Sequence, residues 1–253
     1  MTTQFLIPER RLSLNMPTGR GLHRIVEVSS RDLHPALVFA GTEPLPASAQ
    51  YSQVADNLLH GDWWTPRQIF VTSPAKGDGK TCTAFNLAWA MSLRGQSVLL
   101  VELNFARPQF RTALGDLRIW HGIDGVLRGS AKPADSVFSM GANGLDVCAV
   151  RDATPFAQLK QYLPRLKDFL DWASENYDWL ILDCPPVLSL PWRQWFCEYA
   201  GPALLVVREQ QTPMVETRKA AKLLGANLKG VLLNDSAADD CTSPKLHPDA
   251  KGV

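Results

Sequence analysis

Short apolar runs alternate with longer amphipathic stretches along most of the chain. The runs are nearly continuous in Val, Leu, Ile and Phe, which is typical of strands buried on both faces of a sheet. They fall at residues 68–72, 97–103, 144–150, 178–183, 202–208 and 228–234. Helices are predicted between them, at residues 81–94, about 155–176 and 214–224. This order predicts an α/β fold, with a doubly wound, mostly parallel sheet and helices on both faces.

The two ends of the chain lack this alternation. Residues 1–66 contain scattered Pro and Gly, and we expect a partly ordered N-terminal extension with a helix at about 47–59. Residues 67–235 are expected to form the domain that carries the motifs described below. Residues 236–253 are polar and carry two prolines, which indicates a flexible tail.

Composition excludes several classes of protein. The chain has 253 residues, 20% of them charged, and a formal net charge of +1, so no basic excess points to a nucleic-acid partner. No apolar run approaches the ~18 residues of a membrane span, and the N-terminus lacks the apolar stretch of a signal peptide, so we expect a cytoplasmic protein. The five cysteines lack metal-ligand spacing and are expected to be reduced.

The tryptophans that fall on predicted helices and strands are expected to pack in the core rather than to stack on a ligand. These are Trp89, Trp120, Trp172, Trp179, Trp192 and Trp195.

The strongest chemical signal is the turn between the first strand and the first helix of the domain, which reads SPAKGDGKT from Ser73 to Thr81. Two glycines let the backbone curl around a phosphate, and the helix N-terminus supplies free N–H groups and a positive dipole end. Lys80 would reach the β- and γ-phosphates of ATP, and the Thr81 hydroxyl would bind Mg²⁺. Pro74 replaces the usual leading glycine of this motif. The expected nucleotide-binding residues are Ser73, Gly77, Asp78, Gly79, Lys80, Thr81, Cys82 and Asn234.

Polar side chains at the ends of three other strands support this interpretation. Asp183 ends a central strand and is expected to bind Mg²⁺ together with Thr81. Glu102 ends another strand and is a candidate both for the metal and for catalysis, so the expected catalytic set is Lys80, Glu102 and Asp183. Asn234 ends the last strand, where its amide could recognise the adenine edge.

Together these segments resemble the bacterial tyrosine kinases (BY-kinases), which belong to the ParA/MinD group of P-loop ATPases. The resemblance covers residues 47–235. Besides the phosphate-binding turn, it rests on four further segments that occur in the family's order. They are 102–108 (ELNFARP), 122–129 (GIDGVLRG), 177–186 (YDWLILDCPP) and 230–234 (GVLLN).

The resemblance implies ATP and Mg²⁺ as cofactors and a role in exopolysaccharide or capsule synthesis and export. It also implies a membrane chain-length regulator (co-polymerase) as a partner, a homo-oligomer, and a location at the inner face of the membrane through that partner.

Several motif positions depart from the family pattern. The two aspartates of the second motif are Glu102 and Asn104, and its arginine is Ala106. The chain has four tyrosines, none of them in the tail, where the family carries its autophosphorylation substrate. Both arginines of the family's oligomer-forming motif are replaced, by Ser52 and Ala55. The residues expected to bind the nucleotide are therefore retained, while those that support tyrosine phosphorylation in the family are altered.

Four functions remain open at this point. The first is an ATPase or regulatory subunit with altered kinase chemistry, and the second is an active tyrosine autokinase that uses Glu102. The third is an ATP-binding switch or scaffold without turnover. The fourth, a ParA/MinD-type positioning ATPase, is disfavoured because Ala75 stands where that group has its signature lysine and because no amphipathic helix ends the chain.

Overall fold

The structure is a computed structural model that describes residues 24–25, 33–39, 45–61, 67–115, 118–140, 145–155, 158, 160–189 and 201–234. The strands are β1 (Arg24–Ile25), β2 (Gln68–Thr72), β3 (Val98–Glu102), β4 (Phe138–Ser139), β5 (Leu145–Cys148), β6 (Trp179–Asp183), β7 (Ala203–Arg208) and β8 (Leu228–Asn234). The α-helices are α1 (Pro46–His60), α2 (Lys80–Ser92), α3 (Phe110–Ala113), α4 (Ile123–Arg128), α6 (Leu163–Asn176) and α8 (Met214–Leu224). The 3₁₀ turns among the described residues are η1 (Ala134–Ser136), η2 (Lys160–Tyr162), η3 (Val187–Ser189) and η4 (Gly225–Asn227).

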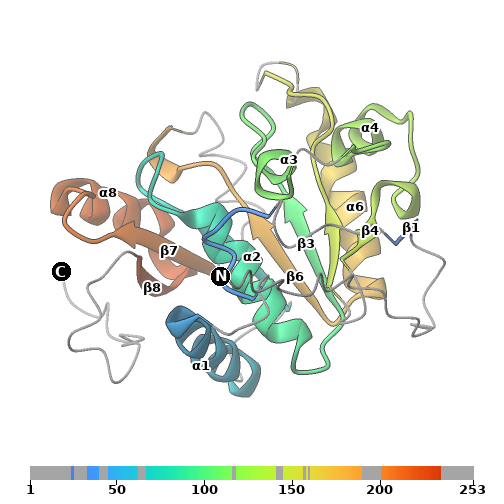
Figure 1. The fold of residues 1–253 in the computed structure, drawn as a ribbon. Helices are drawn as coiled ribbons and strands as arrows, with labels where there is room; N and C mark the ends of the chain where they lie inside the picture. Colours follow the sequence, from blue (N-terminus) through green and yellow to red (C-terminus); the bar gives the residue numbers. More distant parts are fainter. Residues whose placement is uncertain are drawn as a thin grey trace, which may run out of the picture.

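The described strands form one sheet in the order β1-β4-β5-β3-β6-β2-β7-β8 (Figure 1). Every neighbouring pair is parallel except β4 and β5. The predicted α/β fold with a mostly parallel sheet is therefore confirmed. The strand β2, which leads into the phosphate-binding turn, lies between β6 and β7 in the middle of the sheet.

Alternate residues of the central strands enter two separate cores, one on each face of the sheet. In β3, Val98 and Leu100 pack on the face covered by α1, α2 and α3, whereas Leu99 and Val101 pack on the face covered by α4, α6 and α8. The strands β6, β2 and β7 alternate in the same way. Burial on both faces explains why these strands read as continuous apolar runs.

The helix expected at about 47–59 is observed as α1, which packs on α2 through Val54, Ala55 and Leu58. The short segment 33–39 crosses the same face, where Leu33 and Leu37 join the core. The domain boundaries at 66 and 235 remain predictions. The tail 236–253 and the tryptophans at 192 and 195 lie outside the described residues.

Two local predictions differ in detail from the structure. Of the helix expected at about 155–176, α6 covers Leu163–Asn176, with η2 directly before it, and Gln158 is also helical. Residues 156, 157 and 159 lie outside the described residues. Pro164 stands in the first turn of α6, where proline is tolerated. The prediction for Trp120 was wrong, because this residue is 45% exposed and does not lie in the core. The guanidinium of Arg118 lies 3.9 Å from its ring centroid. Trp89 and Trp179, in contrast, are buried as expected.

Within the described part of the chain, helices that are both long and apolar enough to span a bilayer are absent.

Candidate functional site

The turn from Ser73 to Gly79 joins β2 to α2 at the carboxyl edge of the sheet. Gly77 and Gly79 have φ angles of 97° and 89°, which side chains with a Cβ rarely adopt. The N–H of Thr83 donates the first helical hydrogen bond, to the carbonyl of Gly79 at 3.0 Å. The N–H groups of the preceding helical residues therefore have no partner within the helix and are free for an anion.

Asp78 holds this turn in shape through three contacts. Its Oδ2 accepts a hydrogen bond from the N–H of Ala75 at 2.9 Å, and its Oδ1 accepts one from the Thr212 hydroxyl at 2.8 Å. Its backbone carbonyl accepts one from Asn234 Nδ2 at 3.0 Å. The loop after β7 and the end of β8 thus fix the turn from the outside.

Thr81 and Asp183 meet at the floor of the turn. The Thr81 hydroxyl donates to Asp183 Oδ2 at 2.8 Å, while Asp183 Oδ1 is buried and has no hydrogen-bond partner. Burial raises the pKa of Asp183 to about 6, although the nearby Lys80 ammonium and the Thr81 hydroxyl lower it. An unpartnered carboxylate oxygen beside a hydroxyl is a ligand pair suited to Mg²⁺.

Glu102 is placed next to Asp183 by the register of β3 and β6, yet its carboxylate is engaged elsewhere. Its Oε1 accepts from the backbone N–H groups of Gln109 and Phe110, and its Oε2 accepts from that of Val150 at 3.0 Å. Burial raises the pKa of Glu102 to about 7, against the opposing effect of these three donors.

The remaining predicted residues lie around the same turn. The Ser73 hydroxyl donates to the carbonyl of Ala75 at 2.6 Å. Cys82 is half-buried in the first turn of α2, and burial raises the pKa of its thiol. Asn234 directs one amide N–H inward onto the carbonyl of Asp78. Recognition of adenine by Asn234 remains a prediction.

The donor set fits a magnesium-bound nucleoside triphosphate. Lys80 is buried near the carboxyl ends of the central strands, and it supplies the positive charge that phosphates need. Thr81 and Asp183 Oδ1 would hold the metal, whose charge would stabilise the phosphate oxygens and their leaving group.

Sequence reasoning missed Thr212, which is 134 residues from its partner Asp78. No sequence motif marks Thr212 as a residue of this site. The sheet order does give a signal, because β7 is a neighbour of β2, so the loop after β7 must emerge beside the phosphate-binding turn.

Comparisons with known proteins agree with the motif analysis. The sequence is 29% identical over 209 residues to the tyrosine-protein kinase YwqD of Bacillus subtilis, covering 78% of this chain and 87% of YwqD. It is 26% identical over 169 residues to the tyrosine-protein kinase Etk of Escherichia coli K12, covering 66% of this chain and 23% of Etk. The chain thus spans about a quarter of the length of Etk and similar long relatives. A scan against protein-family models gave no match.

Solved structures show the same relationship at the level of the fold. The kinase domain of Escherichia coli Etk superposes with a TM-score of 0.71 at 23% identity, covering 91% of this chain and 88% of that domain. The MinD protein of Pyrococcus horikoshii OT3, solved with Mg-ADP, gives a TM-score of 0.54 at 23% identity over 66% of this chain and 69% of that protein. The resemblance to bacterial tyrosine kinases and the P-loop fold shared with MinD are confirmed.

Proposed function

We propose that this P-loop protein, a relative of bacterial tyrosine kinases, binds ATP with Mg²⁺ and serves exopolysaccharide synthesis and export as an ATPase or regulatory subunit. In this proposal Ser73, the residues from Gly77 to Cys82, and Asn234 surround the nucleotide. Thr81 and Asp183 hold the metal, and Lys80 neutralises the phosphates.

The observation that carries the proposal is the contact between Thr81 and Asp183 beneath the glycine turn. The Thr81 hydroxyl donates a hydrogen bond to Asp183 Oδ2, while Asp183 Oδ1 is buried and has no hydrogen-bond partner. A buried carboxylate oxygen without a donor costs free energy unless a cation satisfies it. A bound Mg²⁺ would remove that cost, and the adjacent Lys80 would bring the triphosphate to it.

The resemblance to bacterial tyrosine kinases implies the pathway and a partner at the membrane, and the similarity to the kinases YwqD and Etk supports that resemblance. By that analogy the partner is a membrane chain-length regulator, which would bring a cytoplasmic protein to the inner face of the membrane. Self-assembly into a homo-oligomer belongs to the same analogy. The motif arginines that would support it are replaced by Ser52 and by Ala55, and Ala55 is fully buried where α1 packs on α2.

Phosphoryl transfer to tyrosine is the second candidate function. It is favoured by the similarity to named kinases. It would require a group that accepts the proton of the attacking hydroxyl, and Glu102 is the candidate from the second motif. The engagement of both its carboxylate oxygens weakens that candidacy.

Calorimetry of the purified chain with ATP and ADP, with and without Mg²⁺, tests the proposal. We expect magnesium-dependent binding that Lys80→Met weakens by about tenfold or more, because the charge-assisted contacts to the phosphates are lost. Lys132→Met, at an exposed position outside the turn, serves as the matched control. Absence of binding by the wild-type chain at millimolar nucleotide would refute the proposal.

The fate of labelled γ-phosphate then separates the candidate functions. Release of inorganic phosphate indicates an ATPase, and label retained on the protein indicates a kinase. Tight binding with neither outcome indicates a switch or scaffold.

A further inference from the structure

We propose that Glu102 is a positioning residue that fastens two loops to the end of β3, and that it is neither a metal ligand nor the base for phosphoryl transfer. The inference rests on the proposed nucleotide site, because it assigns a role to a side chain at its floor. Glu102 is fully buried, and its oxygens receive three backbone N–H donors from two separate segments.

The first segment is the start of α3. The N–H groups of Gln109 and Phe110 stand at the beginning of this short helix, where no preceding helical carbonyl can accept them. Glu102 Oε1 accepts both, the one from Phe110 at 3.0 Å. Since the ring of Phe110 is buried against Phe85 of α2, fixing the start of α3 also fixes this contact beside the phosphate-binding helix.

The second segment is the loop that follows β5, which two buried carboxylates hold together. Glu102 Oε2 accepts the N–H of Val150, and Asp124 Oδ1 accepts the N–H of the next residue, Arg151, at 2.7 Å. The loop then reaches back to the segment that follows β3, where the N–H of Thr154 donates to the carbonyl of Phe105 at 2.9 Å. Glu102 therefore belongs to a network that shapes this loop.

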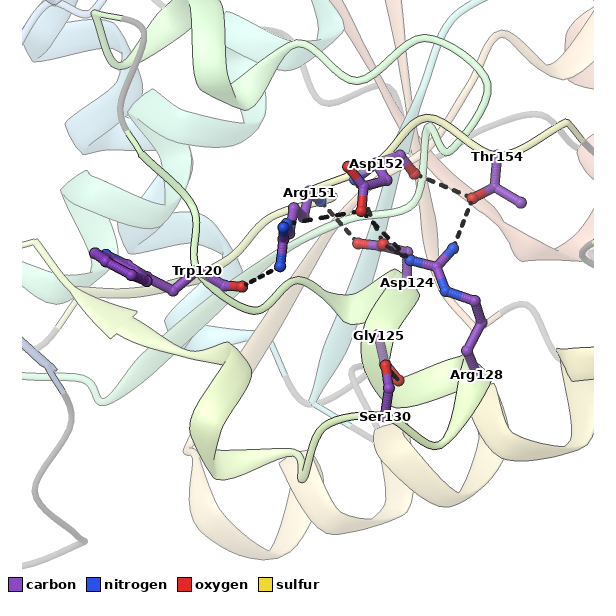
Figure 2. Close-up of polar contacts among 8 residues, drawn as sticks. All are labelled: Trp120, Asp124, Gly125, Arg128, Ser130, Arg151, Asp152 and Thr154. Atoms are coloured by element: carbon purple, nitrogen blue, oxygen red, sulfur yellow. Dashed lines mark hydrogen bonds and ion pairs between the residues drawn. The ribbon is translucent and has the colours of Figure 1, made fainter.

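Figure 2 shows the outer part of this network. The carboxylate of Asp124 points at the loop backbone and forms an ion pair with Arg128 one turn along α4. Arg128 also reaches Thr154, and Arg151 donates to the carbonyl of Trp120 at 2.8 Å. Asp124 is thus a buried acid whose role is to bind backbone N–H groups and a neighbouring cation. Glu102 likewise accepts a backbone N–H of this loop, from Val150.

Side-chain length explains why glutamate suits this role. The carboxylate must pass beyond the end of β3 to reach donors in both α3 and the loop after β5, and an aspartate at this position would be shorter by one methylene, about 1 Å or more in reach. With Oε1 accepting two donors, only one acceptor position is left, on Oε2. The metal would then be held from the protein by Thr81 and Asp183, without a second motif acid.

Hydrogen exchange of the wild-type chain, observed by NMR, tests the inference without any substitution. The amides of Gln109, Phe110 and Val150 depend on Glu102 as their acceptor, so they are expected to be protected. Their protection is expected to stay unchanged when Mg²⁺ and ADP are added. Loss of protection at these three amides on adding Mg²⁺ and ADP would overturn the inference, because Glu102 would then have left them for the metal.

Glu102→Gln provides the second test. An amide cannot accept on both sides, so its NH₂ group opposes a donor in one of the two segments. We expect exchange in residues 109–114 or 150–155 to accelerate by about tenfold or more, with magnesium-dependent nucleotide affinity kept within about threefold of wild type. Glu175→Gln, an exposed acid on α6, is the matched control and should change neither quantity.

Asp183→Asn is the comparison for a metal ligand and is expected to lose the magnesium dependence. Two results would overturn the inference: unchanged exchange in Glu102→Gln, or a loss of magnesium dependence equal to that of Asp183→Asn. Because the exchange measurement on the variant needs no nucleotide, a failure of nucleotide binding would refute the proposed function alone.

Discussion

At the residue scale, the two glycines of the phosphate-binding turn differ in what surrounds them. Both have positive φ, but a Cβ on Gly77 would meet nothing within 4 Å, whereas a Cβ on Gly79 would lie 2.0 Å from Asn234 Nδ2. Asn234 is also the residue that fastens the carbonyl of Asp78. Gly79 is therefore required both by its backbone angle and by the closeness of β8.

A pair of alanine substitutions separates these two requirements. Gly77→Ala is expected to cost only the backbone strain, about 1–2 kcal/mol in free energy of unfolding. Gly79→Ala adds a steric clash that pushes Asn234 away, so we expect a larger loss of stability and at least about tenfold weaker ATP binding. Urea unfolding and calorimetry measure both quantities. Equal effects of the two substitutions would show that the closeness of Asn234 to Gly79 places no requirement on this position.

At the element scale, one arginine directly after α2 adds polar contacts to the apolar packing between α1 and α2. Arg94 pairs with the carboxylate of Asp56, with a distance of 2.7 Å from Nη2 to Oδ2, and donates to the carbonyls of Ser52 and Ala90. The hydrogen bond from Arg94 lowers the pKa of Asp56. The pair therefore contributes stability above the unfolded pKa of this carboxyl, and the contribution is lost as the pH falls through the lower folded value.

Arg94→Met is expected to loosen α1 because it removes every one of these donors. Since the Asp56 side chain is 49% exposed, the ion pair itself contributes only about 0.2–1 kcal/mol, and the backbone contacts add to it. We expect faster hydrogen exchange in residues 46–60 and an unchanged ATP affinity. Asp56→Asn keeps an acceptor for Arg94 and should give a smaller effect. A loss of ATP affinity equal to that of Lys80→Met would contradict this separation of α1 from the site.

Some secondary-structure elements and site contacts could be predicted from the sequence, and others could not. The long buried strands and the helices α2 and α8 were predicted closely, because burial on both faces and helical periodicity leave strong patterns. The two-residue strands β1 and β4 were not predicted, since their pairing depends on neighbours distant in sequence. At the site, a glycine turn and a strand-ending aspartate are local signals. The engagement of Glu102 is not, because its three donors lie in loops whose paths only the folded chain defines.

At the scale of the whole molecule, the candidate site lowers the folding stability of the protein without ligand, and the rest of the fold offsets this loss. Asp183 is buried between β3 and β2 with one oxygen unpartnered, and burial raises its pKa to about 6 from an ordinary value of 3.8. Above that range the folded protein must hold a charge that the unfolded chain would hydrate. Two apolar cores, one on each face of the sheet, provide the stability that offsets this cost.

Asp183→Asn is therefore expected to alter stability and binding in opposite directions. Because the folded pKa is raised, the wild-type carboxyl stabilises the fold most below the unfolded pKa, and this contribution is lost as the pH rises through about 6. The free energy of unfolding of the variant, relative to wild type, should then rise by roughly 2–3 kcal/mol between about pH 4 and pH 7. Urea unfolding without nucleotide measures this trend, and a difference independent of pH would contradict it.

The effect of ligand on stability separates the two proteins in the other direction. With ATP and Mg²⁺ at about one hundred times the dissociation constant, the free energy of unfolding of wild type should increase by about 2.7 kcal/mol. The variant, lacking the carboxylate ligand, should gain far less, because the unpartnered oxygen that weakens the empty fold is the one that would hold the metal.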